Sequence, residues 1–160
     1  MSPDAAAWTA FFAAQVGASA ALSGLVIVAI SINLKQILET PQLPARAAET
    51  LVMLVGSMVL SSIALMPASP ATLGIACLLV AAALWTACVG IQTRAYRDSR
   101  MGPFAFRVAL GQLTAIPMII GSGLLMAGAA TGFFWLAAGT LLAVVTGVLA
   151  TWVLLVEILR

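Results

Sequence analysis

The sequence predicts an all-α integral membrane bundle of five transmembrane helices, with the N-terminus outside and the C-terminus in the cytoplasm. Of the 160 residues, 63% are hydrophobic and 8% are charged, whereas a soluble domain carries roughly 25% charged residues. Apolar stretches of about 20 residues, which is the length needed to cross about 30 Å of hydrocarbon, fill most of the chain. All seven basic residues fall on one side of the membrane when five spans are counted.

The spans follow one another with short connections, so we expect a single transmembrane domain over residues 1–160. They cover about 8–34, 48–66, 71–92, 106–129 and 133–158. Pro41 and Pro44 break the chain after the first span. The turn at 67–70 joins the second and third spans into an antiparallel hairpin. The last apolar stretch is too long for one helix, and we divide it at Gly128–Gly132.

The basic residues set the predicted orientation. Lys35 and Arg46 follow the first span, and Arg160 follows the last. Four arginines follow the third span: Arg94, Arg97, Arg100 and Arg107. Because cytoplasmic loops are rich in Lys and Arg, we expect this side to face the cytoplasm and the protein to be a multi-pass protein of a bacterial plasma (inner) membrane. The four arginines are either a topology signal or contacts to lipid headgroups, at about 1 kcal/mol each.

The composition argues against catalytic and metal chemistry. The chain has no histidine, and its two cysteines, Cys77 and Cys88, lie eleven residues apart in one predicted helix. These facts exclude Ser-His and Cys-His nucleophile pairs and the common zinc ligand sets. Glu49 and Glu157 lie in end turns of spans, each near an arginine, and we interpret them as structural. We therefore predict no enzyme activity, no cofactor, no metal and no nucleic-acid partner.

A polar stripe runs along the first predicted span. Its members are Gln15, Ser19, Ser23 and Asn33. Polar side chains avoid lipid, so the stripe must face another helix or water. One interpretation is hydrogen bonding between helices, at about 0.6 kcal/mol each. The other is a pore in a homo-oligomer. The hydrophobic constriction of such a pore would consist of Leu22, Val26 and Ile30.

Small residues recur at helical spacing on the first and last spans. They include Gly17, Gly24, Gly139, Ala143 and Gly147. Such residues allow the backbones of two helices to approach closely. They predict tight helix packing, either within the chain or between chains.

Three stretches of the first two spans form a distinctive pattern: Trp8-x2-Phe11-Phe12, Ala21-Leu22-Ser23-Gly24-Leu25-x2-Val28-Ala29-Ile30-Ser31-Ile32-Asn33-Leu34, and Leu43-Pro44-x-Arg46-Ala47-x-Glu49-Thr50-Leu51. This pattern resembles a group of small, uncharacterised bacterial multi-span membrane proteins, some of which are labelled modulators of a membrane-bound AAA protease. The resemblance covers the first two spans, and it implies a regulatory role beside a membrane protease.

Two hypotheses about function follow, and the lipid bilayer is a partner in both. The first is a homo-oligomeric, channel-like assembly with the first span lining the axis. It expects Gln15, Ser19 and Asn33 to face a wet lumen, and it fails if they are buried between helices of one subunit. The alternative is a non-catalytic regulatory or scaffold subunit of a larger membrane complex, such as a membrane protease, which expects a membrane protein partner.

Overall fold

The computed structural model describes residues 5–40, 43–98 and 104–158, and the side chains at 5–7, 95–98, 104–110, 153–155 and 157–158 are outside this description. The described residues form six helices and no strand: α1 (Ala5–Ile32), α2 (Leu34–Glu39), α3 (Leu43–Ala64), α4 (Pro70–Asp98), α5 (Phe104–Met126) and α6 (Gly132–Ile158). The predicted all-α class is therefore confirmed for this part of the chain.

Four of these helices are long and apolar enough to cross a membrane: Trp8–Ile32, Leu43–Ala64, Pro70–Arg94 and Gly132–Trp152. Within the described residues, α5 contributes a shorter apolar stretch, Gly111–Met126. A bundle with this many long apolar helices is a multi-pass membrane protein. Each lies within one of the five predicted spans to within a few residues.

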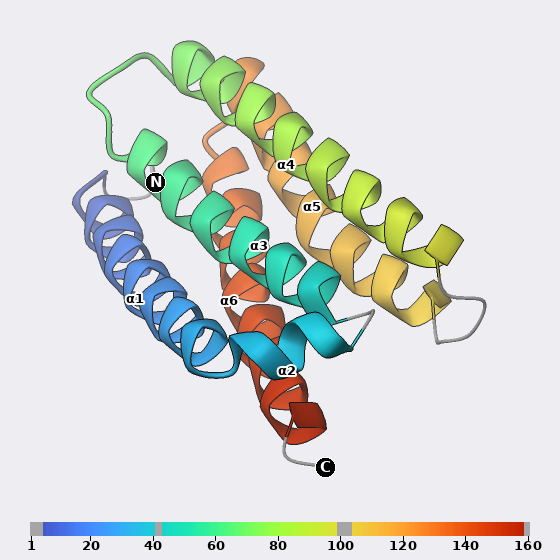
Figure 1. Ribbon diagram of the computed structural model, residues 1–160. Coiled ribbons are helices and arrows are strands. Elements are labelled where there is room, and N and C mark those ends of the chain that lie inside the picture. The colour runs from blue at the N-terminus through green and yellow to red at the C-terminus, as the bar shows by residue number, and fades with distance from the viewer. Residues whose placement is uncertain (1–4, 41–42, 99–103, 159–160) are drawn as a thin grey trace.

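The helices lie side by side in a bundle with α3 and α6 near its middle (Figure 1). Helix α1 forms one edge, where it contacts α3 and α6. Helices α4 and α5 pack against each other and form the opposite edge, with α4 also against α3 and α5 also against α6. This arrangement separates α1 from the α4–α5 pair by the width of the bundle.

Aromatic rings fix the start of α1 against the start of α6. Trp8 stacks on Phe133 with ring centroids 5.8 Å apart, and it meets Phe134 edge to face at 4.7 Å. Phe12 is almost fully buried beside the same group. Tryptophan and phenylalanine side chains bury large areas, so this contact holds α1 to the bundle at its first turns.

The connection after α1 contains a short helix where the sequence indicated only a polar loop. Helix α2 forms because Ile37 is buried against Leu43 and Ala47 at the start of α3, with Ile30 packed on the same cluster. The helix ends at Glu39, and the next residue, Thr40, has an extended backbone, since a residue before proline is disfavoured in the helical region.

The two tight turns at the other end of the bundle have clear local causes. Pro70 begins α4, where its missing N–H costs nothing, and the Ser69 hydroxyl accepts the Thr72 N–H at 3.2 Å. After α5, Gly128 takes a φ of +79°. The Ala129 N–H then reaches the Leu124 carbonyl at 2.8 Å, which closes the helix end.

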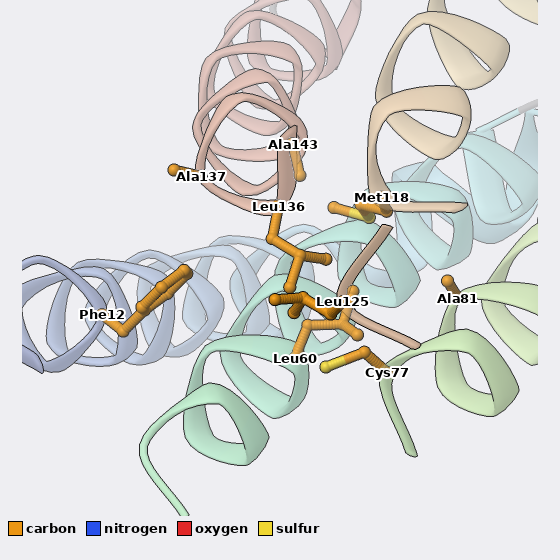
Figure 2. Close-up of a cluster of buried hydrophobic side chains, with 9 residues drawn as sticks. All are labelled: Phe12, Leu60, Cys77, Ala81, Met118, Leu125, Leu136, Ala137 and Ala143. Carbon is orange, nitrogen blue, oxygen red and sulfur yellow. The ribbon is translucent and has the colours of Figure 1, made fainter. Parts of the chain in front are cut away.

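The main hydrophobic core lies at the level of these turns. Figure 2 shows Leu60, Leu125 and Leu136 meeting at its centre, with Cys77 beside them. These side chains come from α3, α5, α6 and α4, respectively. Phe12 of α1 belongs to the same cluster, so the core ties all five long helices together.

Candidate intramembrane interface

Gln15 and Ser19 of the polar stripe on α1 form hydrogen bonds to two other helices of the same chain. Gln15 Nε2 donates to Ser57 Oγ of α3 at 3.2 Å and to the main-chain oxygen of Thr140 in α6 at 2.9 Å. Ser19 Oγ bonds Ser57 Oγ at 3.2 Å. Ser57 in turn donates to the Thr140 oxygen at 3.3 Å. Gln15 is 5% exposed and Ser19 is 0% exposed. We call this group the three-helix junction.

This placement corrects the pore interpretation of the stripe. Side chains that bond neighbouring helices of the same chain cannot line a lumen on an axis shared by several copies. Ser23 is also buried and donates to the Ser19 main-chain oxygen at 2.7 Å. Asn33 is half-buried and donates to the Ala29 oxygen of its own helix at 2.9 Å. The stripe therefore serves packing within this chain.

The three residues expected to form a hydrophobic constriction are also buried or half-buried within this chain. Val26 is 5% exposed and lies in the bundle interior, and Leu22 is half-buried. Ile30 packs against the Ile37 cluster at the α2–α3 turn. A dewetting constriction requires side chains that face an open path, whereas Val26 is buried and Ile30 packs on the Ile37 cluster.

A second buried polar contact joins α3 to α4. The Gln92 amide donates a hydrogen bond to the Glu49 carboxylate, and both residues are buried. Gly111 of α5 lies against this pair, because a Cβ at that position would be 3.0 Å from Gln92 Nε2. Glu49 thus has a hydrogen-bond partner on another helix, whereas the sequence indicated a partner near its own turn, and its structural role stays a prediction. The side chain of Glu157 lies outside the described residues.

The small residues of α6 pack inside the chain. A Cβ at Gly139 would lie 2.6 Å from Met118 Cγ, and one at Gly147 would lie 2.8 Å from Leu54 Cδ2. Ala143 is 1% exposed. These positions let α6 approach α5 and α3 closely, which is the packing role that small residues predict.

Gly17 and Gly24 of α1 behave differently. A Cβ at either position would meet nothing within 4 Å. Both are exposed, as are the neighbouring Ala13, Ala20 and Ala21, and they lie on the side of α1 opposite to Gln15. We call these five residues the α1 outer face. Within the described chain, this face has no helix packed on it.

An indole–amide pair lies on the opposite edge of the bundle. Trp85 Nε1 of α4 donates to Gln112 Oε1 of α5 at 2.9 Å. Trp85 is 40% exposed, although its central place in the span favours an interior position. Gln112 is half-buried. Hydrogen bonding to α5 explains how the indole N–H is satisfied at a surface that lipid would otherwise cover.

The predicted headgroup arginines are described only in part. Arg94 is exposed near the end of α4. The side chains of Arg97 and Arg107 lie outside the described residues, and so does the whole of Arg100. Lipid headgroup contact by these four residues therefore stays a prediction.

A small cavity of about 30 Å³ lies among α3, α4, α5 and α6. Its walls are mainly apolar and include Met53, Ala81, Leu84 and Met118. This volume matches roughly one water molecule. It is a packing void at the junction of four helices.

Sequence reasoning missed the partners of the polar stripe. Ser57 is one of three serines in the second predicted span, and Gln92 is the last residue of the third. Their alignment with Gln15 and Glu49 depends on how the helices are placed side by side. A polar residue in the middle of a span is itself a signal that a partner is needed. That signal also marks Gln112. Comparisons with protein families, with curated proteins and with solved structures find no match to this chain.

Proposed function

We propose that this protein is a small, non-catalytic membrane protein that associates with copies of itself in the bilayer through α1. The observation that supports this most directly is the contrast between its glycines. The sites at Gly74, Gly121, Gly132, Gly139 and Gly147 would each bring a Cβ within 3.0 Å of a neighbouring helix, whereas a Cβ at Gly17, Gly24, Gly90, Gly123 or Gly128 would meet nothing. Of these open sites, Gly17 and Gly24 are the exposed pair on one helix.

Small residues on a helix in lipid are useful mainly where another helix approaches, because association in lipid depends on close van der Waals packing. Other outward positions carry both small side chains, such as Ala82 on α4 and Ala138 on α6, and large ones. Examples are Leu79 on α4, Leu113 on α5 and Val145 on α6, all exposed. Among the glycines in the described helices, Gly17 and Gly24 are the two that are exposed, and for this reason we propose the α1 outer face as the surface for a second helix.

The proposal includes five membrane crossings. Helix α5 packs along both α4 and α6, and its apolar stretch Gly111–Met126 lies between two helices that are each long enough to span. With five crossings, the seven basic residues share one side, so the N-terminus faces outward and the C-terminus faces the cytoplasm of a bacterial plasma membrane.

Conduction through a lumen lined by α1 polar residues is not part of the proposal, because Gln15 and Ser19 are used inside the chain. The proposal keeps one part of the homo-oligomer hypothesis, namely that α1 lies at the contact between subunits. The alternative role, a regulatory or scaffold subunit for a larger complex, predicts a monomer by itself and a specific membrane partner.

The test is the mass of the purified protein in lipid nanodiscs, measured by native mass spectrometry. We expect a defined homo-oligomer. Gly17→Leu and Ala21→Leu should each convert it to monomer, because a leucine side chain would separate the packed helices. Ala138→Leu, which adds the same bulk to an exposed position on α6, is the matched control and should leave the mass unchanged.

A monomeric wild-type protein would overturn the proposal and favour the regulatory-subunit alternative. An oligomer that survives both α1 variants would show that another face carries the contact. Folding of each variant is checked by its helical circular dichroism, since the open space around the α1 sites predicts no effect on the isolated chain. Orientation is tested separately with a C-terminal fluorescent-protein fusion, which fluoresces only when the C-terminus is cytoplasmic.

A further inference from the structure

Helix α2 has an apolar side and a polar side, although it is only 6 residues long. Successive side chains on a helix are turned by about 100°. Leu34, Ile37 and Leu38 therefore fall within one arc of about 100° on the helical wheel. The opposite side holds the polar residues Lys35, Gln36 and Glu39. This pattern is typical of a helix that lies between a nonpolar and an aqueous environment.

The rest of the chain covers only one edge of the apolar side. Ile37 is 2% exposed, because it packs against Leu43 and Ala47 at the start of α3. On the other edge, Leu34 is 50% exposed and Leu38 is 66% exposed. Contact of two leucine side chains with water is unfavourable, so this edge of α2 requires a nonpolar environment outside the bundle.

The position of α2 along the chain identifies that environment. The apolar part of α1 that precedes it, Trp8–Ile32, contains 25 residues and is therefore about 37 Å long. The hydrocarbon core of a bilayer is about 30 Å thick, so α1 has crossed it by Ile32 and α2 begins at the membrane surface. The candidate span of α6, which runs in the same direction as α1, ends at the exposed Trp152. Tryptophan is enriched at this level of the membrane.

The chain bends at Asn33, immediately before α2. The Asn33 side-chain amide donates to the Ala29 main-chain oxygen at 2.9 Å, and the Asn33 main-chain N–H reaches the same oxygen at 3.3 Å. A side chain that enters the helical ladder in this way bends a helix. Helix α2 accordingly turns away from the direction of α1 (Figure 1). A straight continuation of α1 would carry Leu38 out into water, whereas the bend keeps it near the membrane surface.

The exposed edge of α2 also continues a surface of α1 that meets lipid. Leu25 and Ile32 are exposed, and their spacing of seven residues places them on one stripe of α1. Both belong to a candidate membrane span, and the outward side chains of a membrane-spanning helix meet lipid. Leu34 follows Ile32 by two residues, so one apolar surface extends from the span onto α2.

We infer that α2 is a membrane-surface contact whose partner is the phospholipid bilayer. Leu34 and Leu38 insert among the acyl chains next to the headgroups, and the polar side of α2 faces water. Lys35 and Glu39 leave α2 without net charge, so the contact depends on apolar insertion and needs no anionic lipid. This inference goes beyond the proposed self-association and does not depend on it.

Nitroxide labels on introduced cysteines test the orientation of α2 in liposomes. The variants are Leu34→Cys, Leu38→Cys and Gln36→Cys, all at exposed positions. The natural cysteines are buried, and the wild-type protein measures any background label. Each label is tested for collision with dissolved oxygen, which concentrates in lipid, and with a water-soluble nickel complex. We expect the labels at 34 and 38 to collide mainly with oxygen and the label at 36 mainly with nickel, in phosphatidylcholine with or without phosphatidylglycerol.

Leu38→Ser gives a second measurement by amide hydrogen exchange over residues 34–39 in nanodiscs. A helix of this length is not stable by itself in water, so loss of an inserted side chain should increase its opening. We expect exchange to rise about 3-fold to 12-fold, which corresponds to half of the transfer free energy of a leucine side chain. Gln36→Ser is the matched control, because it also replaces a good helix former by serine, and it should change exchange less than about twofold.

Four results would overturn the inference. Nickel access at all three labels would mean that α2 faces water. Protection of the labels at 34 and 38 from both reagents would mean that protein, from a second copy or another partner, covers the leucines. An oxygen preference seen only with phosphatidylglycerol would contradict apolar insertion, and so would equal exchange in Leu38→Ser and Gln36→Ser. None of these results depends on the mass measurement that tests self-association, so the two proposals can fail separately.

Discussion

Substitution of Gly74 by alanine should destabilise the fold through helix separation. A Cβ at this α4 position would lie 2.3 Å from Met126 N and 2.8 Å from Ser122 O, both main-chain atoms of α5. Ordinary contact begins at 3.4 Å, so the helices must move apart locally by about 1 Å. A gap of that size forfeits a quarter to a half of each affected dispersion contact.

The expected size of the effect follows from two opposing terms. Overpacking of this kind costs about 1–3 kcal/mol, and alanine recovers up to about 1 kcal/mol relative to glycine in a helix. We therefore expect Gly74→Ala to lower the free energy of unfolding by about 1–2 kcal/mol. Gly17→Ala, where the Cβ meets nothing, should leave it unchanged or raise it by up to about 1 kcal/mol.

The assay is unfolding of the monomer in mixed micelles with rising sodium dodecyl sulfate, followed by circular dichroism. Both variants replace a helical glycine by alanine, so their difference isolates the packing term. Equal unfolding free energies for Gly74→Ala and Gly17→Ala would refute the reasoning, because they would mean that the α4–α5 approach is not limited by main-chain contact.

Three further predictions use the same assay or a labelling variant of it. Gln15→Leu removes two interhelical hydrogen bonds and should cost about 1 kcal/mol, with a coupling to Ser57→Ala of at least about 0.5 kcal/mol; strict additivity would contradict the junction. Gln92→Leu removes the hydrogen bond to the buried Glu49 carboxylate and should cost about 1–3 kcal/mol, with a coupling to Glu49→Leu of at least about 0.5 kcal/mol; no loss in Gln92→Leu would count against the contact. Both natural cysteines are buried, so maleimide should label them only after detergent unfolding, and fast labelling of the folded protein would be inconsistent with that burial.

Element identity was predictable because it depends on local properties of the sequence. Apolar runs, the proline pairs and Gly128–Gly132 place the helices and turns to within a few residues, since hydrocarbon thickness and backbone chemistry act on each segment separately. The short helix α2 was not predictable from a polar connection. It forms because Ile37 finds a buried place against Leu43, which is a property of the folded bundle.

The candidate interface was only half predictable. The wheel of α1 identifies a polar side and a small-residue side, but it does not say which side meets the rest of the chain. That choice depends on Ser57 and Thr140, whose positions opposite Gln15 follow from the register of three helices.

The two sides of α1 are physically coupled. The hydrogen bonds of Gln15 and Ser19 fix the rotation of α1 about its axis, because slippage by one residue would turn these groups by about 100° and bring them toward lipid. Fixing the polar side inward also fixes Gly17 and Gly24 outward. A helix held only by apolar contacts would be free to rotate and to bury its small residues against α3. The polar stripe thus bonds helices of this chain, and by fixing the rotation of α1 it keeps the α1 outer face turned outward, as the proposed self-association requires.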